Sequence, residues 1–260
     1  GGGRDVFNEK PSADEQRVVA PSATTALGRV DAAVDRMIAD KEIAGAVVLV
    51  ARKGATVHTT IRGHRDVASR APMARNTLFR IYSMTKPITS VAVLQLVERG
   101  LVRLDDPVAR HLPAFKGVSV YTASGRTAPH RAVSVRDLLR HTSGLSYGFF
   151  GDGPVDKLYK KNNPLWSANN AELVTKTVAL PLAHHPGERW TYSIATDVLG
   201  ALIERVTGKT LGAYLHEHIL MPLKMVDTAF HVPKGKLSRF ASSYAPGGAL
   251  VEGAKGSPFQ

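Results

Sequence analysis

The sequence contains no cysteine among its 260 residues. This absence excludes disulfide bonds, thiol catalysis and zinc or iron–sulfur sites with cysteine ligands. It leaves the compartment open, because cytosolic and periplasmic proteins both function without cysteine. We expect a cytoplasmic location slightly ahead of a periplasmic or secreted one.

Long apolar runs are absent as well. The longest, residues 44–51, has the length of a buried strand and falls short of the roughly 18 apolar residues of a membrane span. Residues 1–5 carry no apolar core like that of a signal peptide. The patterning therefore predicts a soluble chain without a membrane span.

Acidic residues are fewer than basic ones. The sequence has 22 Asp and Glu against 34 Lys and Arg, a net charge of +12. Such a balance raises the question of nucleic acid, but the basic residues are scattered and no basic run is interleaved with aromatic residues. We expect a solvated basic surface and no nucleic-acid partner.

Hydrophobic patterning divides the chain into four parts. Residues 1–26 are polar and predict a flexible N-terminal arm. Residues 27–83 predict a helix, over 27–38, and a hairpin, which together form the N-terminal part of an α/β lobe. Residues 84–225 predict a helical lobe, and residues 226–260 the start of a return to the α/β lobe that breaks off.

The helical lobe is predicted from amphipathic stretches bounded by Gly and Pro. These stretches cover residues 87–100, 135–141, 171–180, 197–206 and 211–220. In the first of them, the helical spacing of Ile88, Val91, Leu94 and Val97 predicts one buried face.

Ser83 and Lys86 form an S-x-x-K motif at the start of the first of these helices. That spacing places both side chains on one helical face. A lysine in a partly dry site can activate a serine hydroxyl, since desolvation lowers the lysine pKa. On its own the motif is a weak signal, and an N-capping serine followed by a solvated lysine is the favoured interpretation.

Four ordered segments make the motif specific. Residues 80–115 read RIYSMTKPITSVAVLQLVERGLVRLDDPVARHLPAF and closely resemble the nucleophile region of class C β-lactamases, related carboxylesterases and D-alanyl-D-alanine peptidases. Residues 133–145, 186–200 and 208–223 resemble further stretches of the same superfamily, so that the similarity covers about 27–230. The resemblance implies an α/β (α+β) fold of the β-lactamase/transpeptidase type, an antiparallel sheet layer with helices beside a mostly helical region.

The resemblance also implies a set of site residues. Ser83 would be the acylated nucleophile, Lys86 its proton partner and Tyr192 the phenolic member of the triad. A phenol can act as a base near neutrality only if a neighbouring lysine favours its phenolate. Tyr82, Ser146, Tyr147 and Ile194 would contact the substrate, a small-molecule ester or amide. No metal and no organic cofactor is implied.

The chain departs from the family pattern in two places. Ile194 stands two residues after Tyr192, where β-lactamases and peptidases have an asparagine that would hydrogen-bond an acylamido group. The third family motif, on a late strand, has no match after Tyr192. The chain therefore resembles a member that lacks its C-terminal third, with a sheet that is incomplete unless a separate chain supplies the missing strands.

These features favour a serine carboxylesterase that forms an acyl-enzyme with short-chain esters. A β-lactamase, D-amino-acid peptidase or penicillin-binding protein is the second hypothesis, and an acyltransferase the third. A catalytically incompetent ligand-binding or interaction protein is the alternative from another class.

Other motifs are weaker. Ser146 lies in a G-x-S-x-G pattern, but a helix is predicted before it and a loop after it, unlike a nucleophile elbow. Residues 208–210 resemble the end of a phosphate-binding loop without its upstream glycine, and are interpreted as a helix C-cap. The pairs His184–His185 and His216–His218 lack metal-site spacing and are interpreted as surface histidines.

Overall fold

The structure, a computed structural model, describes residues 26–253. Almost all of the predicted N-terminal arm lies outside these residues. The chain folds into two compact units, which we call the sheet unit (up to Arg80 and from His231) and the helical unit (Ile81–Phe230). Within the described residues, no helix is both long enough and apolar enough to cross a membrane.

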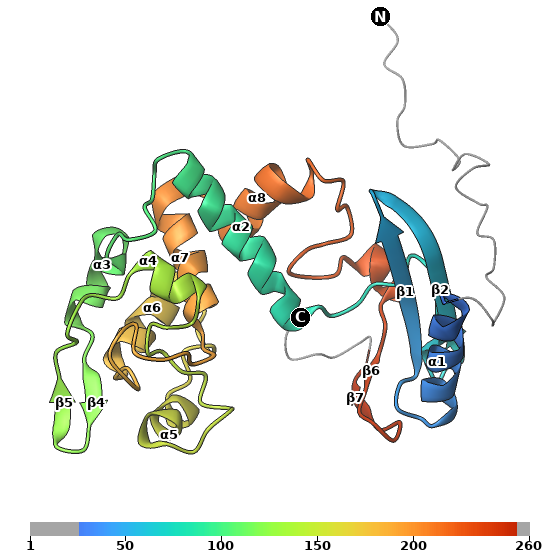
Figure 1. Cartoon of the computed structure of the whole chain (residues 1–260), viewed down its shortest axis with the longest axis horizontal. Coiled ribbons are helices and arrows are strands. Elements are labelled where there is room, and N and C mark those ends of the chain that lie inside the picture. The colour runs from blue at the N-terminus through green and yellow to red at the C-terminus, as the bar shows by residue number, and fades with distance from the viewer. Residues whose placement is uncertain (1–25, 254–260) are drawn as a thin grey trace, which may run out of the picture. The chain divides into compact units, whose positions relative to one another are not determined.

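The sheet unit begins with a helix on a hairpin (Figure 1). Helix α1 (Gly28–Ala39) precedes β1 (Gly45–Arg52), β2 (Ala55–Asp66) and the short β3 (Ala71–Pro72), which form one antiparallel sheet in that order. The Asp31 carboxylate of α1 accepts hydrogen bonds from Thr60 and from His58, whose Nε2 lies 3.0 Å away. These polar contacts fix α1 on the sheet beside the buried Val34.

The last described segment belongs to the same unit. It contains a 3₁₀ helix, η5 (Lys234–Arg239), and the paired strands β6 (Ser243–Tyr244) and β7 (Leu250–Glu252). Leu78 bridges Phe240 in parallel, and Ser242 Oγ donates to Asp66 Oδ2 at 2.6 Å. Two segments more than 150 residues apart in sequence therefore complete one unit.

The helical unit is built around α7 (Ala195–Thr207), whose residues are buried on most sides. Helices α2, α4, α6 and α8 pack against it. Before α7 the unit contains η2 (Tyr82–Met84), α2 (Thr85–Glu98), α3 (Val108–His111), η3 (Pro113–Gly117), the hairpin β4 (Val120–Thr122) and β5 (Gly125–Thr127), α4 (Val135–Leu139), α5 (Pro154–Lys161) and α6 (Asn170–Ala179). After it come α8 (Leu211–Leu215) and a π-helical turn, His216–Leu220.

Three details differ from the sequence-based predictions. On α2 the buried face carries Thr89, Ala92, Val93 and Leu96, while the predicted Val91 and Leu94 are exposed. The pattern was misleading because α2 is apolar on nearly every side, so periodicity could not choose a face. Helix α5 was not predicted because residues 149–154 suggested an extended loop, and the β4–β5 hairpin was not predicted because its strands have only three residues each.

Candidate active site

Ser83 and Lys86 meet at the start of α2. Ser83 lies in η2, the single turn that leads directly into the helix, and its side chain is exposed. The preceding Tyr82 has a φ of 42°, a left-handed conformation that is rare for a bulky residue. Lys86 Nζ donates a hydrogen bond of 3.1 Å to Ser83 Oγ.

Tyr192 reaches the same oxygen from the loop before α7. Its hydroxyl donates to Ser83 Oγ at 2.7 Å. The three residues that the sequence grouped are therefore side by side within the helical unit, with Ser83 Oγ as the shared acceptor.

Residues 141–144 hold the loop that carries Tyr192. The carbonyls of His141 and Thr142 accept the N–H groups of Thr191 and Gly187, each at 2.8 Å. Gly144 has a φ of 88°, and a Cβ there would lie 2.4 Å from a backbone carbonyl of the loop. Only glycine permits this close approach.

The pKa values of the two groups on Ser83 shift in opposite directions. Burial alone would lower the pKa of Lys86, but its hydrogen bonds with Tyr147 and Tyr192 outweigh burial and raise the pKa above its usual value. Burial alone would raise the pKa of Tyr192, but the hydrogen bonds with Lys86 and Ser83 and the Lys86 charge lower it. Desolvation therefore acts on Lys86 as expected, but it does not bring the pKa toward neutral. Lys86 stays a cation, which favours the phenolate of Tyr192.

Tyr147 is a second phenol beside Lys86. The centroid of its ring lies 5.2 Å from Lys86 Nζ and 5.3 Å from the centroid of the Tyr192 ring. Burial raises the pKa of Tyr147 in spite of the hydrogen bond with Lys86, so this phenol stays neutral. Lys86 thus contacts one phenol with a raised pKa, Tyr147, and one with a lowered pKa, Tyr192.

Two further titratable groups near Lys86 were not predicted from the sequence. The pKa of His141 is lowered by burial and by the Lys86 charge, and its ring centroid is 4.9 Å from that of Tyr192. Burial raises the pKa of the Asp197 carboxyl in the first turn of α7, against the opposing effect of Lys86. No motif pointed to these side chains, because only the fold brings them to Lys86.

Exposed aromatic rings surround Tyr192. Phe150 and Trp190 are 75% and 65% exposed, and their ring centroids lie 5.7 Å and 6.0 Å from that of Tyr192. Phe149 stacks on Tyr147 at 5.7 Å. We call Tyr147, Phe149, Phe150, Trp190 and Tyr192 the aromatic rim; it gives the site an apolar border.

Two residues expected to contact substrate are inside the protein. Ser146 is 3% exposed, donates to Asp156 Oδ1 at 2.5 Å and accepts the Gly148 N–H. Helix α4 precedes it, so it does not lie on a nucleophile elbow. Ile194 has no exposed surface and packs in a small core cluster around Tyr159. Both side chains are therefore enclosed by the helical unit, and their contact with a substrate stays a prediction.

One of the four histidines expected at the surface differs from that expectation, whereas His216 is exposed and His218 partly exposed. His184 is not at the surface: it is 4% exposed, and its Nε2 lies 3.0 Å from Thr191 Oγ1, inside the loop that carries Tyr192. His185 is partly exposed and takes part in a separate group of side chains, described below.

Comparisons with known proteins find similar sequences and a similar fold. A family model described as Beta-lactamase matches residues 30–258. Protein Rv1367c of Mycobacterium tuberculosis is 40% identical over 78% of the chain and 51% of the relative, and Esterase EstB of Burkholderia gladioli is 38% identical over 86% and 56%. The solved structure of EstCE1, a hydrolase with promiscuous acyltransferase activity, matches with a TM-score of 0.76 and 31% identity, over 86% of this chain and 58% of that one. The chain spans about half the length of the curated relatives it matches.

Proposed function

The chain belongs to the Beta-lactamase family, with a β-lactamase/transpeptidase-like fold, and from this premise we propose that it is a serine carboxylesterase that forms an acyl-enzyme on Ser83. The observation that carries the proposal is the double hydrogen bond to Ser83 Oγ, from Tyr192 at 2.7 Å and Lys86 at 3.1 Å. A nucleophile, its base and the cation that supports the base are thereby within reach of one another.

The acylation step begins once the Tyr192 hydroxyl, which donates to Ser83 Oγ in the structure, has released its proton to solvent and is a phenolate beside the Lys86 cation. The phenolate takes the proton of the Ser83 hydroxyl as Oγ bonds to the ester carbonyl carbon, and the carbonyl oxygen becomes an oxyanion. The backbone N–H of Ser83 serves as one oxyanion donor. When the oxyanion collapses, the bond to the alcohol oxygen breaks, and the leaving alkoxide takes the proton from Tyr192.

Deacylation repeats the sequence with water. Tyr192 takes a proton from the water molecule as its oxygen bonds to the acyl carbon. The Ser83 oxygen then leaves with that proton, and the carboxylic acid is released. Lys86 stays protonated throughout, because its raised pKa favours the cation at each step.

Two observations favour an ester over a lactam. Ile194 supplies no amide where the β-lactamases and peptidases of the family have one, and its side chain is buried. The aromatic rim offers apolar surface for the acyl or alcohol part of a short-chain ester. The esterase name of EstB, 38% identical to the chain, supports the same substrate class.

Acyl transfer is the second candidate. The rim can bind an acceptor alcohol in place of water at the acyl-enzyme, and the solved structure of EstCE1 is described as a hydrolase with promiscuous acyltransferase activity. An added alcohol that increases acyl-ester product at the expense of free acid would support transfer.

The test is hydrolysis of p-nitrophenyl butyrate against nitrocefin, by the wild type and by Ser83→Ala. We expect the wild type to prefer the ester and Ser83→Ala to lose about 10⁴-fold or more in kcat/KM. Intact-mass analysis after a fluorophosphonate should place one adduct on Ser83. Unchanged esterase activity in Ser83→Ala would overturn the mechanism, and absence of both adduct and turnover would favour a ligand-binding protein.

Adduct formation also measures the reactivity of Ser83 independently of ester turnover. A chain that forms the adduct but does not turn over would have a competent Ser83 and an incomplete pocket. Addition of a separate chain that supplies strands would then restore turnover, and its failure to do so would remove that partner from the proposal.

A further inference from the structure

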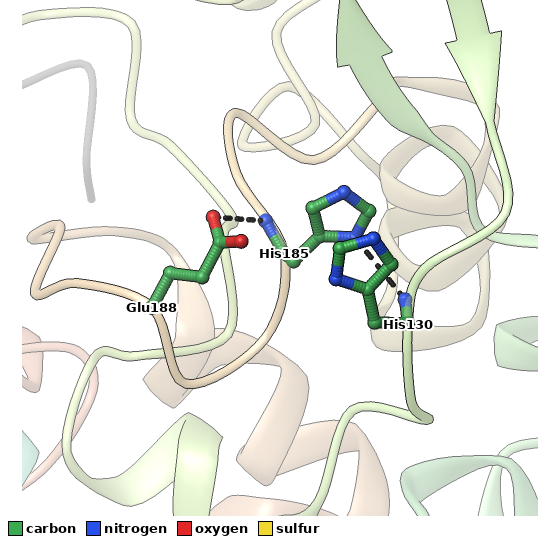
Figure 2. A group of neighbouring side chains, drawn as sticks. All are labelled: His130, His185 and Glu188. Atoms are coloured by element: carbon green, nitrogen blue, oxygen red, sulfur yellow. Dashed lines mark hydrogen bonds between the residues drawn. The ribbon is translucent and has the colours of Figure 1, made fainter.

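Three potential metal ligands lie together in the helical unit, away from the hydrogen bonds of Ser83. Figure 2 shows His130, from the segment between β5 and α4, beside His185 and Glu188 of the loop that leads to Tyr192. One ligand atom from each of the three side chains lies within 4.8 Å of the others. The two imidazole rings stack with centroids 3.5 Å apart and planes within 8° of parallel.

Backbone hydrogen bonds hold this group in place. The His130 N–H donates to His185 Nδ1 at 3.1 Å, and the His185 N–H donates to Glu188 Oε2 at 3.1 Å. In the described part of the chain, the ring nitrogens of His130 and Glu188 Oε1 have no hydrogen-bond partner. Their lone pairs are therefore open to a ligand from solvent.

We propose that His130, His185 and Glu188 form a binding site for a divalent transition-metal ion such as Zn²⁺, Ni²⁺ or Cu²⁺. Two imidazole nitrogens and one carboxylate oxygen suit these borderline ions, whereas Mg²⁺ and Ca²⁺ prefer oxygen alone. Water completes the coordination, because His130 and Glu188 are exposed.

Binding requires only movement of side chains. A tetrahedral ion with bonds of about 2.1 Å holds its ligand atoms roughly 3.4 Å apart, closer than the present upper limit of 4.8 Å. The lone pairs of an imidazole lie in the ring plane, so the stacked rings must splay to converge on one ion. The exposed His130 and Glu188 have room to turn, and the adjacent Arg131 is already paired with Asp137.

The remaining histidines of the two sequence pairs, His184, His216 and His218, do not offer three free metal ligands. The buried His184 bonds to Thr191 Oγ1 and to the His185 carbonyl. Beside His216 and His218, the Glu217 carboxylate is paired with the Lys209 ammonium. The sequence alone could not reveal the site, because His130 lies 55 residues before His185.

An ion at this site would join the segment before α4 to the loop that carries Tyr192, and so make that loop more rigid. The proposal does not depend on ester hydrolysis, because binding is measured without substrate. Calorimetric titration of the chain with Zn²⁺ should show one site, and the ion should raise the Tm of the wild type.

Single substitutions locate the ion. His130→Ala and Glu188→Gln should each weaken Zn²⁺ binding by about tenfold or more, since even groups that only orient a ligand commonly cost that much. Both residues are exposed, so both variants should keep the wild-type circular dichroism spectrum and metal-free Tm. The matched control His216→Ala, another exposed histidine, should bind Zn²⁺ as the wild type does.

The same titrations can overturn the proposal. It fails if the wild type binds no Zn²⁺ and no Ni²⁺ in the micromolar range. It also fails if His130→Ala and Glu188→Gln bind Zn²⁺ as tightly as the wild type, or if His216→Ala weakens Zn²⁺ binding as much as they do. The two proposals can fail separately. If the folded wild type binds Zn²⁺ but has no esterase activity, and His130→Ala loses the binding, the metal site stands and the esterase proposal fails.

Discussion

Lys86 lies between two phenols whose pKa values move in opposite directions. Burial raises the pKa of Tyr147, while Lys86 and Ser83 together lower that of Tyr192. The Tyr192 hydroxyl donates to Ser83 Oγ at 2.7 Å, and the Tyr147 ring lies beside the Tyr192 ring, tilted by 48°. In the mechanism that we propose, Tyr192 therefore carries the proton and Tyr147 helps to hold the Lys86 cation.

Replacement of Lys86 by methionine tests that division. In Lys86→Met the cation that favours the Tyr192 phenolate is gone, so the Tyr192 pKa should rise toward its ordinary value near 10. Because activity is lost as the pH falls below the Tyr192 pKa, the acidic limb of the kcat/KM profile should move to higher pH. At pH 7 we expect a loss of about 10²–10⁴-fold. A uniform loss with an unmoved limb would show that Lys86 does not act through Tyr192.

The two tyrosines should respond differently to loss of the hydroxyl. Tyr192→Phe removes the base and should lower kcat by about 10²–10⁴-fold. Tyr147→Phe keeps the ring and removes one partner of Lys86, so we expect about a tenfold loss in kcat. The matched control Tyr121→Phe, a partly exposed tyrosine on β4, should leave kcat unchanged. Equal losses in Tyr147→Phe and Tyr192→Phe would contradict the separate roles.

At the scale of single residues, the sequence predicts the three side chains that the proposed mechanism uses. Ser83, Lys86 and Tyr192 follow from a resemblance in ordered segments, and the structure brings them together. The neighbours that tune them could not be predicted. His141 and Asp197 carry no motif, and their pKa shifts arise from burial and from distance to Lys86, which only the folded chain defines.

At the scale of elements, α4 fixes the turn that supports the Tyr192 loop. Ser134 caps this helix in a reciprocal capping box with Asp137. The fully buried Asp137 carboxylate also accepts hydrogen bonds from Arg131 and from Thr142 Oγ1. The Thr142 carbonyl in turn accepts the Gly187 N–H of the loop.

Asp137→Asn should destabilise the helical unit by about 2–4 kcal/mol at pH 7, since it weakens several charged hydrogen bonds at a buried position. The partners of Asp137, chiefly Arg131 and Ser134, outweigh burial and hold its pKa far below the ordinary value. Its contribution is therefore complete above the unfolded pKa of about 4 and is lost as the pH falls through the folded pKa. In urea unfolding, the difference in free energy of unfolding between wild type and Asp137→Asn should become smaller as the pH falls below 4.

Asp105→Asn provides the control for that measurement. Asp105, in the loop before α3, pairs at 2.8 Å with Arg136 of α4, but the Asp105 side chain is 76% exposed. A pair in solvent contributes little, so this variant should unfold with the wild type. If Asp105→Asn were as unstable as Asp137→Asn, burial would not be the reason for the effect.

The elements themselves were largely predictable, and their packing was not. The predicted helix over 27–38 corresponds to α1, and the one over 171–180 to α6. The buried face of α2 was missed, because Val91 and Leu94 are as apolar as Val93 and Leu96, and the pattern alone does not say where the core lies. Helix α5 was missed because residues 149–154 suggested an extended loop.

At the scale of the molecule, the sheet unit depends on a late segment of the chain. Arg80 links the two parts: its Nε lies 2.7 Å from Glu252 Oε2, and its other nitrogens donate to the carbonyls of Ala241 and Gly253. Its guanidinium also lies 4.1 Å from the centroid of the Phe240 ring. The sequence predicted a return to this lobe after residue 226 but could not name Arg80 as the link, since no motif marks it.

Replacement of Arg80 by alanine should therefore act on the sheet unit alone. The Arg80 and Glu252 side chains are only 9% and 11% exposed, so loss of the guanidinium leaves a nearly buried carboxylate without that partner. We expect the unit to lose about 2–4 kcal/mol. Hydrogen exchange should accelerate in β2, β6 and β7 while amides of α7 keep their protection. Arg75→Ala, which removes an exposed arginine with one long hydrogen bond to Thr59, should leave both units unchanged. Faster exchange in α7 of Arg80→Ala, equal to that in β2, would instead mean that the two units unfold as one.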